Sequence, residues 1–396
     1  MRIAEPQSLR ERIAASPDAI LVMVVLVIFM DMMIYGLLIP IFPQYAVWFG
    51  VDESVVGVIF GLYAAMLLVF SIPMGLLSDR VGRRPLIAGG MLLLALATAL
   101  FGLSVTVLHL TIARTVQGIS AAATWSAGLA LIADTCDPAR LGEKMGIALS
   151  SVGLGTVLGP VAGGLLFEYA GHTATFIIPA VLAGIIGLIV LAIPVCSTRR
   201  ERPPLLPRGS LLPLAVCAVV TVAVSGTYGV IDPYLPVHLH AAFSAPPAMI
   251  GGIFAVLAVA TIIAQPIAGR IYDRYGGSRY LISGGLLLAG AAIFTAVQAE
   301  TLLITGVTIF MLGIGLGSAL VPVMPILAEI YRNHGSQGAA YGIYNTFYSM
   351  GLSVGPFAGA LILGRWALTT IFHLLAAVIV VAGVLCWSAI GRSGWR

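Results

Sequence analysis

The chain has 396 residues, of which 60% are hydrophobic and only 9% are charged, with a mean hydropathy of +1.06. A soluble domain carries about 25% charged residues, so this composition excludes a soluble globular protein and predicts a chain that lies mostly in lipid. The formal net charge of +4 does not indicate a nucleic-acid partner, because the basic residues lie at the ends of apolar runs rather than in one patch.

Apolar runs separated by charged or turn-rich breaks predict twelve membrane-spanning helices. At about 1.5 Å per residue, such runs are long enough to cross a hydrocarbon core of about 30 Å. The predicted spans are residues 19–42, 55–78, 86–104, 107–133, 144–168, 175–196, 210–236, 249–271, 280–298, 302–329, 339–363 and 369–390. We therefore expect an all-α polytopic membrane protein.

The second half of the chain repeats landmarks of the first half in the same order. The repeated landmarks are Tyr35-Gly36 with Tyr228-Gly229, Gly75-x-x-x-Asp79-Arg80-x-Gly82 with Gly269-x-x-x-Asp273-Arg274-x-Gly276, and Gly155-x-x-x-Gly159-Pro160-x-x-Gly163 with Gly351-x-x-x-Gly355-Pro356-x-x-Gly359. The repeat predicts two pseudo-symmetric six-helix bundles, residues 19–196 and 210–390, joined by a linker at 197–209, with tails at 1–18 and 391–396. Membrane chains built from two repeats place a binding site between their halves, which indicates a transporter.

Charge placement predicts the orientation of the chain. Eighteen of the 20 lysine and arginine residues fall on alternate loops, on one side of the predicted membrane. The positive-inside rule makes that side cytoplasmic, so we expect both termini in the cytoplasm and the protein in the cell (inner, cytoplasmic) membrane. The first apolar run is too long for the core of a cleavable signal peptide, so we expect it to remain as an anchor.

Two charged residues lie inside predicted spans and have no charged counterpart in the repeat. Asp31 lies in the middle of the first span, where a charge costs roughly 2.5–3.5 kcal/mol on insertion scales, which favours a functional role. A carboxyl group removed from water favours its protonated form, so Asp31 is a candidate proton carrier and cation ligand. Arg114 in the fourth span cannot lose its proton, but it can bias a nearby carboxyl group. Structural roles, as a satisfied aspartate and a helix-packing arginine, are the alternatives.

Two further acids are candidates with open roles. Asp232, beside Pro233, is an external proton port, a second cation contact or a solvated carboxylate near the outer surface. Glu329 is either a coupling acid or a helix-end residue. The repeat pairs it with Asp134 at the end of the fourth span, which favours the helix-end role. With Asp31, these residues give up to three acids against Arg114, a balance that favours cationic or neutral lipophilic substrates.

Aromatic residues accompany these charges. Tyr341, Tyr344 and Tyr348 recur at helical spacing with Asn345 alongside, and Trp125 shares a helix face with Arg114. Aromatic faces attract cations by about 0.5–2 kcal/mol, although plain packing is the commoner meaning of such a stripe. Tyr35 recurs with the repeat, which favours architecture over binding.

The loop at 75–85, GLLSDRVGRRP, carries the most specific motif. We expect Gly75 to allow close helix approach, Asp79, Arg80 and Arg83 to act in gating, and Gly82 to permit a tight turn. The Asp-Arg core recurs as Asp273 and Arg274, but the flanking basic residues do not recur. This loop resembles the signature of the major facilitator superfamily, as does the stretch Arg114-x-x-Gln117-Gly118. The fifth span also resembles this superfamily. Its glycine-proline stretch is similar to the antiporter signature of the drug:proton branch and consists of Gly155, Gly159, Pro160, Gly163 and Gly164.

A narrower resemblance concerns the charged spans. Asp31 with Pro40 and Pro43, Asp232-Pro233-x-x-Pro236, and Pro322 ahead of Glu329 are similar to vesicular amine transporters and their bacterial drug-exporting relatives. The chain departs from that group in two places. Tyr63 stands where the group has a lysine, and Asn345 stands where it has an aspartate. Both members of an ion pair are therefore missing, and we list Tyr63 and Asn345 as substrate contacts.

These patterns predict a proton-coupled antiporter that exports amphipathic, cationic small molecules by rocking one bundle against the other. We expect no enzymatic activity, no cofactor, no metal site, no nucleic-acid partner and a monomer in the bilayer; no phosphate-binding G-x-x-x-x-G-K-[ST] stretch is present. The alternatives are an exporter of another solute class, such as a sugar, siderophore or lipid, and an uncoupled facilitator or an inward symporter of the same fold.

Overall fold

The computed structural model describes residues 17–136, 140–193, 211–275, 277–332 and 337–393. Within these ranges the chain is helical and forms no strand. The elements are α2 (Pro17–Leu37), the 3-10 helix η1 (Ile39–Ile41), α3 (Phe42–Phe49), α4 (Glu53–Val81), α5 (Arg83–Gly102), α6 (Val107–Thr135), α7 (Leu141–Ala192), α8 (Leu211–Phe243), α9 (Pro247–Tyr275), α10 (Ser278–Ala296), α11 (Leu302–Leu320), α12 (Val323–Arg332), α13 (Gln337–Leu363) and α14 (Leu368–Ser393). The predicted linker 197–209 and most of the two predicted tails lie outside the described residues.

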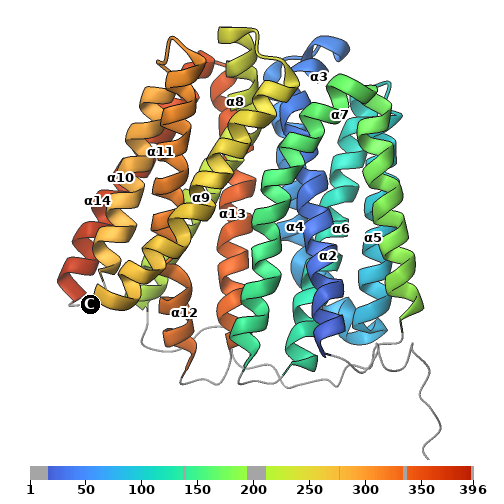
Figure 1. Ribbon diagram of the computed structural model, residues 1–396, viewed down its shortest axis with the longest axis horizontal. Helices are drawn as coiled ribbons and strands as arrows, with labels where there is room; N and C mark the ends of the chain where they lie inside the picture. Colours follow the sequence, from blue (N-terminus) through green and yellow to red (C-terminus); the bar gives the residue numbers. More distant parts are fainter. Residues whose placement is uncertain (1–16, 137–139, 194–210, 276, 333–336, 394–396) are drawn as a thin grey trace, which may run out of the picture.

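The helices account for twelve membrane crossings. Among the described residues, eleven apolar helical stretches are long enough to span a bilayer, and the longest of them, Lys144–Ala192, has 49 residues. A straight helix of that length would extend over about 70 Å, far more than a hydrocarbon core of about 30 Å. Gly171 interrupts the helix with φ of 80°, and Figure 1 shows α7 turning back on itself near its upper end. The expected twelve-helix all-α fold is therefore confirmed.

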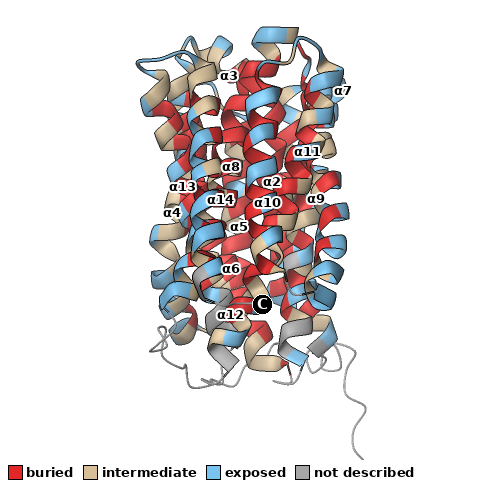
Figure 2. Cartoon of the chain, turned by 90° about the vertical axis from the view of Figure 1, so that its left-hand side faces the viewer, coloured by how far each residue is buried: buried red, intermediate tan, exposed pale blue. Residues whose placement is uncertain are grey.

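The outer surface of the bundle suits lipid. Figure 2 shows buried residues along the inside of the bundle and exposed residues on its outside. Many exposed side chains are large and apolar, such as Ile72, Leu303 and Leu361, each of which is more than 70% exposed. A soluble protein rarely exposes such a continuous apolar surface, whereas a surface in contact with the hydrocarbon core of a bilayer is apolar.

The helices before residue 194, which we call the N-half, pair in the same way as those after residue 210, the C-half (Figure 1). In the N-half, α2 packs on α7, α4 on α6, and α5 on both α6 and α7. In the C-half, α8 packs on α13, α9 on α11, and α10 on both α11 and α14. The sequence repeat thus corresponds to a repeated set of helix contacts.

Corresponding helices of the two halves begin with the same kind of N-cap or glycine turn. Thr106 and Thr301 are the N-caps of α6 and α11, and the hydroxyl of each accepts a backbone N–H from three residues further on. Gly82, with φ of 96°, precedes α5, and Gly277, with φ of 68°, precedes α10. Side chains with a Cβ rarely adopt these angles, so both turns depend on glycine.

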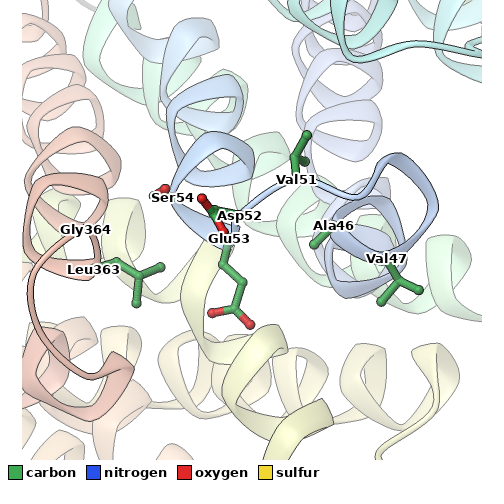
Figure 3. A pocket seen from close by; sticks show the side chains of 8 residues that line it. All are labelled: Ala46, Val47, Val51, Asp52, Glu53, Ser54, Leu363 and Gly364. Atoms are coloured by element: carbon green, nitrogen blue, oxygen red, sulfur yellow. The ribbon is translucent and has the colours of Figure 1, made fainter.

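The bundle has two distinct ends. We call one the basic end, where α4 meets α5 at Arg83 and Arg84, and the other the α3 end, where α3 lies (Figure 1). At the basic end, Lys144 of α7 pairs with Asp18 of α2 at 2.7 Å. At the α3 end, an open depression of about 580 Å³ lies between α3, the start of α4 and the end of α13 (Figure 3).

The two halves meet mainly through α4 with α13 and α7 with α9. Small residues bring these helices close together near the α3 end. A Cβ added to Gly61 of α4 would lie 3.0 Å from Pro356 of α13, and one added to Gly164 of α7 would lie 2.9 Å from Ala248 of α9. Gly251 of α9 likewise faces the backbone of Pro160. The structure is therefore a state in which the halves are packed together at the α3 end.

Replacement of Gly251 by valine tests this packing. The new side chain would meet the Pro160 backbone, and overpacking of a tight contact costs about 1–3 kcal/mol. We expect a lower melting temperature for Gly251→Val in detergent, measured by intrinsic fluorescence. Gly252→Val is the matched control, because a Cβ there meets nothing within 4 Å among the described residues. Equal melting temperatures for the two variants would contradict the close approach.

Candidate proton and substrate site

Asp31 lies in the middle of α2 and is held by residues of two neighbouring helices. Its side chain is 1% exposed. The Tyr63 hydroxyl of α4 donates to its Oδ2 at 2.6 Å, and the Trp125 indole N–H of α6 donates to the same oxygen at 2.8 Å. The other oxygen, Oδ1, has no hydrogen-bond partner among the described residues. One half of the carboxyl group is therefore fixed by neutral donors, and the other half is free to take a ligand.

Tyr63 thus supplies a hydrogen bond where the resembled group has a lysine. A phenol donates a hydrogen bond without adding a positive charge. Asp31 is therefore not neutralised by an ion pair with α4, and the missing lysine leaves it available to another cation.

Arg114 of α6 lies at the centre of the polar residues of the N-half and is fully buried. Its Nη1 donates to Oε1 of Gln117 at 3.1 Å, and its Nε donates to the Phe60 carbonyl at 3.4 Å. The guanidinium carbon lies 4.4–4.9 Å from the ring centroids of Phe60, Tyr35 and Tyr63. Such cation–π contacts are worth about 2 kcal/mol or more where the cation is desolvated. Nη2 has no partner among the described residues.

Asp232 of α8 joins this site from the other half of the protein. The Tyr35 hydroxyl of α2 donates to its Oδ2 at 2.9 Å, and Asp232 is 5% exposed. The alternative of a solvated surface carboxylate is therefore wrong for this conformation. Tyr35, for which the repeat favoured architecture, makes the contact that links the halves. Its repeat counterpart, Tyr228, instead lies 3.5 Å from the Thr261 hydroxyl.

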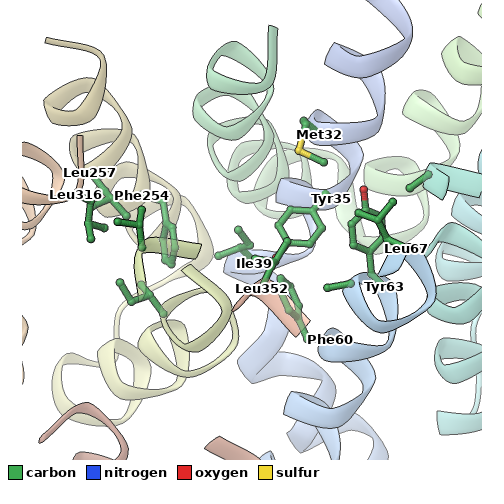
Figure 4. Packing of buried hydrophobic residues seen from close by; sticks show 14 of the residues in the cluster. Met32, Tyr35, Ile39, Phe60, Tyr63, Leu67, Phe254, Leu257, Leu316 and Leu352 are labelled. Atoms are coloured by element: carbon green, nitrogen blue, oxygen red, sulfur yellow. The ribbon is translucent and has the colours of Figure 1, made fainter. Parts of the chain in front are cut away.

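The two tyrosines and the arginine form one compact unit. Tyr35 and Tyr63, both labelled in Figure 4, have ring centroids 4.9 Å apart. Both rings contact the Arg114 guanidinium, and their hydroxyls donate to different aspartates. We call Asp31, Tyr35, Tyr63, Arg114 and Asp232 the charged cluster. Within it, no ion pair of 4 Å or less joins Arg114 to either acid. The tyrosine side chains lie between the arginine and the acids, and they contact the arginine through their rings and the acids through their hydroxyls.

The predicted aromatic stripe of α13 lies beside the charged cluster. The rings of Tyr344 and Tyr348 are 5.9 Å apart, and both side chains are half-buried, as is Asn345. Tyr348 is near enough to Tyr35 and Asp232 to interact electrostatically with both. The side chain of Tyr341 lies outside the described residues.

Glu329 does not join the charged cluster. It lies on α12 at the basic end with an exposed side chain, and its charge acts on Tyr272 of α9 (Figure 1). This position favours the helix-end role over the coupling role. Of the three candidate acids, the cluster contains Asp31 and Asp232, against one arginine.

The loop between α4 and α5 is held by a buried arginine. Arg83 is 7% exposed; its Nη1 lies 2.6 Å from Oδ1 of Asp79 and its Nε donates to Oδ2 of Asp134 at 2.9 Å. These contacts join α4, α5 and α6 at the basic end. Arg80 is exposed, and a Cβ added to Gly75 would meet nothing within 4 Å of the described residues. The expected close helix approach at Gly75 is therefore absent from this conformation.

The matching loop of the C-half is built differently. Asp273 and Arg274 are exposed, and the Arg274 guanidinium lies 5.4 Å from the Tyr275 ring centroid. One flanking arginine does recur, contrary to the sequence expectation. Arg84 donates to the Val190 carbonyl of α7 at 3.1 Å, and Arg279 donates to the Trp387 carbonyl of α14 at 3.0 Å. The carbonyl that Arg84 contacts lies in the last turn of α7, whereas Trp387 lies six residues before the last residue of α14.

The glycine-proline stretch of α7 positions the helix that carries Asp31. Added Cβ atoms at Gly155 and Gly159 would lie 3.0 Å from the Met33 nitrogen and 2.6 Å from the Met33 carbonyl oxygen of α2. Gly163 faces Leu37 in the same way, and the Pro160 ring faces Gly36. The exception is Gly164, which faces α9 of the other half. The stretch therefore sets the distance between α2 and α7 and contributes to the contact between the halves.

Sequence reasoning missed two partners of Arg114, Gln117 and Phe60, and a third residue, Thr98, that is connected to it through Gln117. Gln117 orients the guanidinium and in turn donates to the Thr98 hydroxyl at 3.2 Å. Its signal was present, because Gln117 belongs to the Arg114-x-x-Gln117-Gly118 stretch and lies on the same helix face. Phe60 contributes its carbonyl and its ring, and Thr98 extends the network to α5; neither carries a pattern that distinguishes it from ordinary packing.

Comparisons with known proteins agree with this fold. A family model described as the Major Facilitator Superfamily matches residues 24–215 and 217–393. The MFS-type transporter ppzB of Metarhizium rileyi is 34% identical over 185 residues, which are 46% of this chain and 38% of that protein. The human synaptic vesicular amine transporter is 26% identical over 348 residues, covering 85% of this chain and 67% of that protein.

Among solved structures, a bacterial homologue of the human lysosomal transporter Spinster, in an inward-facing and occupied conformation, superposes with a TM-score of 0.75. It is 15% identical, and the match covers 94% of this chain and 95% of that chain. At this identity the likeness concerns the fold. The resemblances expected from the motifs, to the superfamily and to vesicular amine transporters, are confirmed.

Removal of the Tyr35 hydroxyl tests the link between the halves. In Tyr35→Phe, Asp232 loses its donor, and an unsatisfied buried acceptor costs about 1–3 kcal/mol. We expect a lower melting temperature in detergent. Tyr228→Phe is the control at the repeat-related position, where only the long 3.5 Å contact to Thr261 is lost. A Tyr35→Phe protein as stable as Tyr228→Phe would contradict the hydrogen bond.

Replacement of Arg83 tests the loop at the basic end. Arg83→Gln leaves Asp79 and Asp134 without their shared cation, and loss of one partner from a buried ion pair costs about 3 kcal/mol. We expect a clear loss of thermal stability by fluorescence in detergent. Arg80→Gln changes the same charge at an exposed position and should alter stability by less than about 0.5 kcal/mol. Similar losses in both variants would show that net charge, rather than this contact, matters.

Proposed function

Because this chain belongs to the Major Facilitator Superfamily and is a multi-pass membrane transporter rather than an enzyme, we propose that it is a proton-coupled antiporter. It exports amphipathic, cationic small molecules across the cell membrane by alternating access. The proposal places the basic end and both termini in the cytoplasm, in keeping with the positive-inside rule.

The observation that carries the proposal is the environment of Asp31. A buried carboxyl group with one oxygen fixed by Tyr63 and Trp125, and with Oδ1 unpartnered, offers a single position for a positive charge. Either a proton or the cationic group of a substrate occupies it. Since the two compete for one oxygen, binding of the substrate displaces the proton, which is the requirement for antiport.

The residues around Asp31 suit an aromatic or lipophilic cation. The rings of Tyr63 and Trp125 flank the carboxyl group, and the Tyr344–Tyr348 pair lies on the facing helix of the C-half. Rings of this kind attract cations through their faces and accept apolar groups. The relatives named as synaptic vesicular and chromaffin granule amine transporters support the same class of substrate.

Alternating access follows from the contacts between the halves. With the basic end in the cytoplasm, the contacts near the α3 end hold the two halves together on the outer side of the membrane. Conversion to the outward-facing state requires the α4–α13 and α7–α9 contacts near Gly61, Gly164 and Gly251 to separate. The Arg83 network keeps α4, α5 and α6 together at the basic end, so the N-half moves as one body.

Transport by purified protein in liposomes with an acidic interior and an enclosed pH-sensitive dye tests the proposal. The added substrate is a permanently charged aromatic quaternary ammonium ion, because an ordinary amine crosses lipid in its neutral form and removes protons by itself. We expect the wild type to release protons when the cation is added, and Asp31→Asn to release none. Glu300→Gln, which changes an exposed carboxylate, should behave as the wild type does.

Two outcomes contradict the proposal. Entry of the cation without proton release identifies an uncoupled facilitator. Proton release that persists in Asp31→Asn excludes Asp31 as the coupling group. Protein-free liposomes give the background leak, and melting temperatures confirm that each variant is folded.

A further inference from the structure

The buried charges of the cluster do not cancel. Asp31, Asp232 and Arg114 are each 5% exposed or less. Apart from Arg83 at the basic end, they are the only Asp, Glu, Lys or Arg residues classed as buried in the described part of the chain. When both acids are ionised, the cluster therefore carries one net negative charge.

The three charges act as one electrostatic unit. The hydroxyls of Tyr63 and Tyr35 reach Asp31 and Asp232, and both rings contact the guanidinium of Arg114. The charge of Arg114 therefore acts on both acids. The other titratable groups nearby, Tyr228 of α8 and Tyr344 and Tyr348 of α13, interact with the cluster as phenols, and phenols are neutral at physiological pH.

A net charge in this position is costly, because a buried charge needs a partner. The cluster becomes neutral in two ways: one proton on a carboxyl group, or one monovalent cation beside it. Oδ2 of Asp31 already accepts two hydrogen bonds and Oδ2 of Asp232 accepts one, whereas Oδ1 of Asp31 is unpartnered. Oδ1 of Asp31, which is fully buried and has no partner among the described residues, is therefore the position that we assign to the balancing charge.

We propose that the charged cluster holds one exchangeable positive charge, so that one proton is exchanged for one monovalent organic cation and transport is electroneutral. This inference rests on the proposed antiport and adds the charge of the substrate and the exchange ratio. In the exchange, the O–H bond of the Asp31 carboxyl group breaks, the proton passes to water, and the carboxylate pairs with the incoming cation. No covalent bond of the substrate changes. A dication would leave the cluster with a net positive charge and is therefore disfavoured.

The first test is the effect of membrane potential. Proteoliposomes are clamped by potassium and valinomycin at zero and at 100 mV, with one fixed pH gradient, and uptake of an aromatic mono-quaternary ammonium ion is measured. Electroneutral exchange predicts the same accumulation at both potentials. If each cycle moved one net charge, 100 mV would change the accumulation ratio about 50-fold, and such a change would overturn the inference.

The second test compares substrates that differ in charge alone. A bis-quaternary ion built on the same aromatic group as the mono-quaternary ion should compete at least roughly tenfold less well, because its second charge has no partner in the cluster. Equal competition by the two ions would contradict a single exchangeable charge.

The third test resets the charge of the cluster. Asp232→Asn keeps an acceptor for the Tyr35 hydroxyl but leaves Asp31 and Arg114 balanced, so we expect cation-driven proton release to fall at least roughly tenfold. Adding Arg114→Gln to this variant restores one net negative charge and should restore proton release. The melting temperature of each variant shows whether it is folded. If Asp232→Asn is as active as the wild type, or if the folded double variant stays inactive, the inference is wrong.

The failures of the two proposals are distinguishable. If the wild type exchanges no cation for protons under any condition, the proposed antiport fails and this inference fails with it. If exchange occurs but responds to potential, or if Asp232→Asn exchanges protons as the wild type does, the antiport stands and only the single-charge inference fails.

Discussion

The buried guanidinium of Arg114 is the constraint on which the site depends. Arginine cannot become neutral by losing its proton, and a charge at the centre of a bilayer protein is costly unless it is satisfied. The protein satisfies it with Gln117, the Phe60 carbonyl and three aromatic rings rather than with a direct ion pair. Both acids therefore remain close to a positive charge without being neutralised by it. A direct ion pair would have left Asp31 less free to bind a proton or a cation.

The arrangement of four helices follows from this constraint. Tyr35 of α2 and Tyr63 of α4 contact the guanidinium of α6, and their hydroxyls hold the two acids in place, one of them on α8. The glycines of α7 bring its backbone against α2 on either side of Asp31. The small residues thus set the distance between the helices, and at that distance the tyrosine hydroxyls form hydrogen bonds with the two acids.

The helices and part of the candidate site could be predicted from the sequence. Periodic apolar runs and the repeat predicted the twelve helices, and the cost of intramembrane charge singled out Asp31 and Arg114. The contact of Tyr35 with Asp232 was not predictable, because it depends on how the two halves pack, and neither residue's local pattern contains that information. Arg279 was missed as a counterpart of Arg84 because the two copies of the motif are shifted by one residue relative to each other at this position. The backbone carbonyls that these two arginines contact are visible only in three dimensions.

The repeat also separates architecture from chemistry. Gly118 of α6 approaches the Tyr63 backbone, and the matching Gly313 of α11 approaches the backbone of Leu257, the residue that matches Tyr63. In the C-half, the positions that match Asp31, Arg114 and Gln117 are Val224, Ile309 and Leu312, and all three are buried. The same helix packing therefore forms around apolar side chains. Since the C-half folds with apolar residues at these three positions, folding alone does not explain Asp31, Arg114 and Gln117 in the N-half, and the cost of burying them is accounted for by transport.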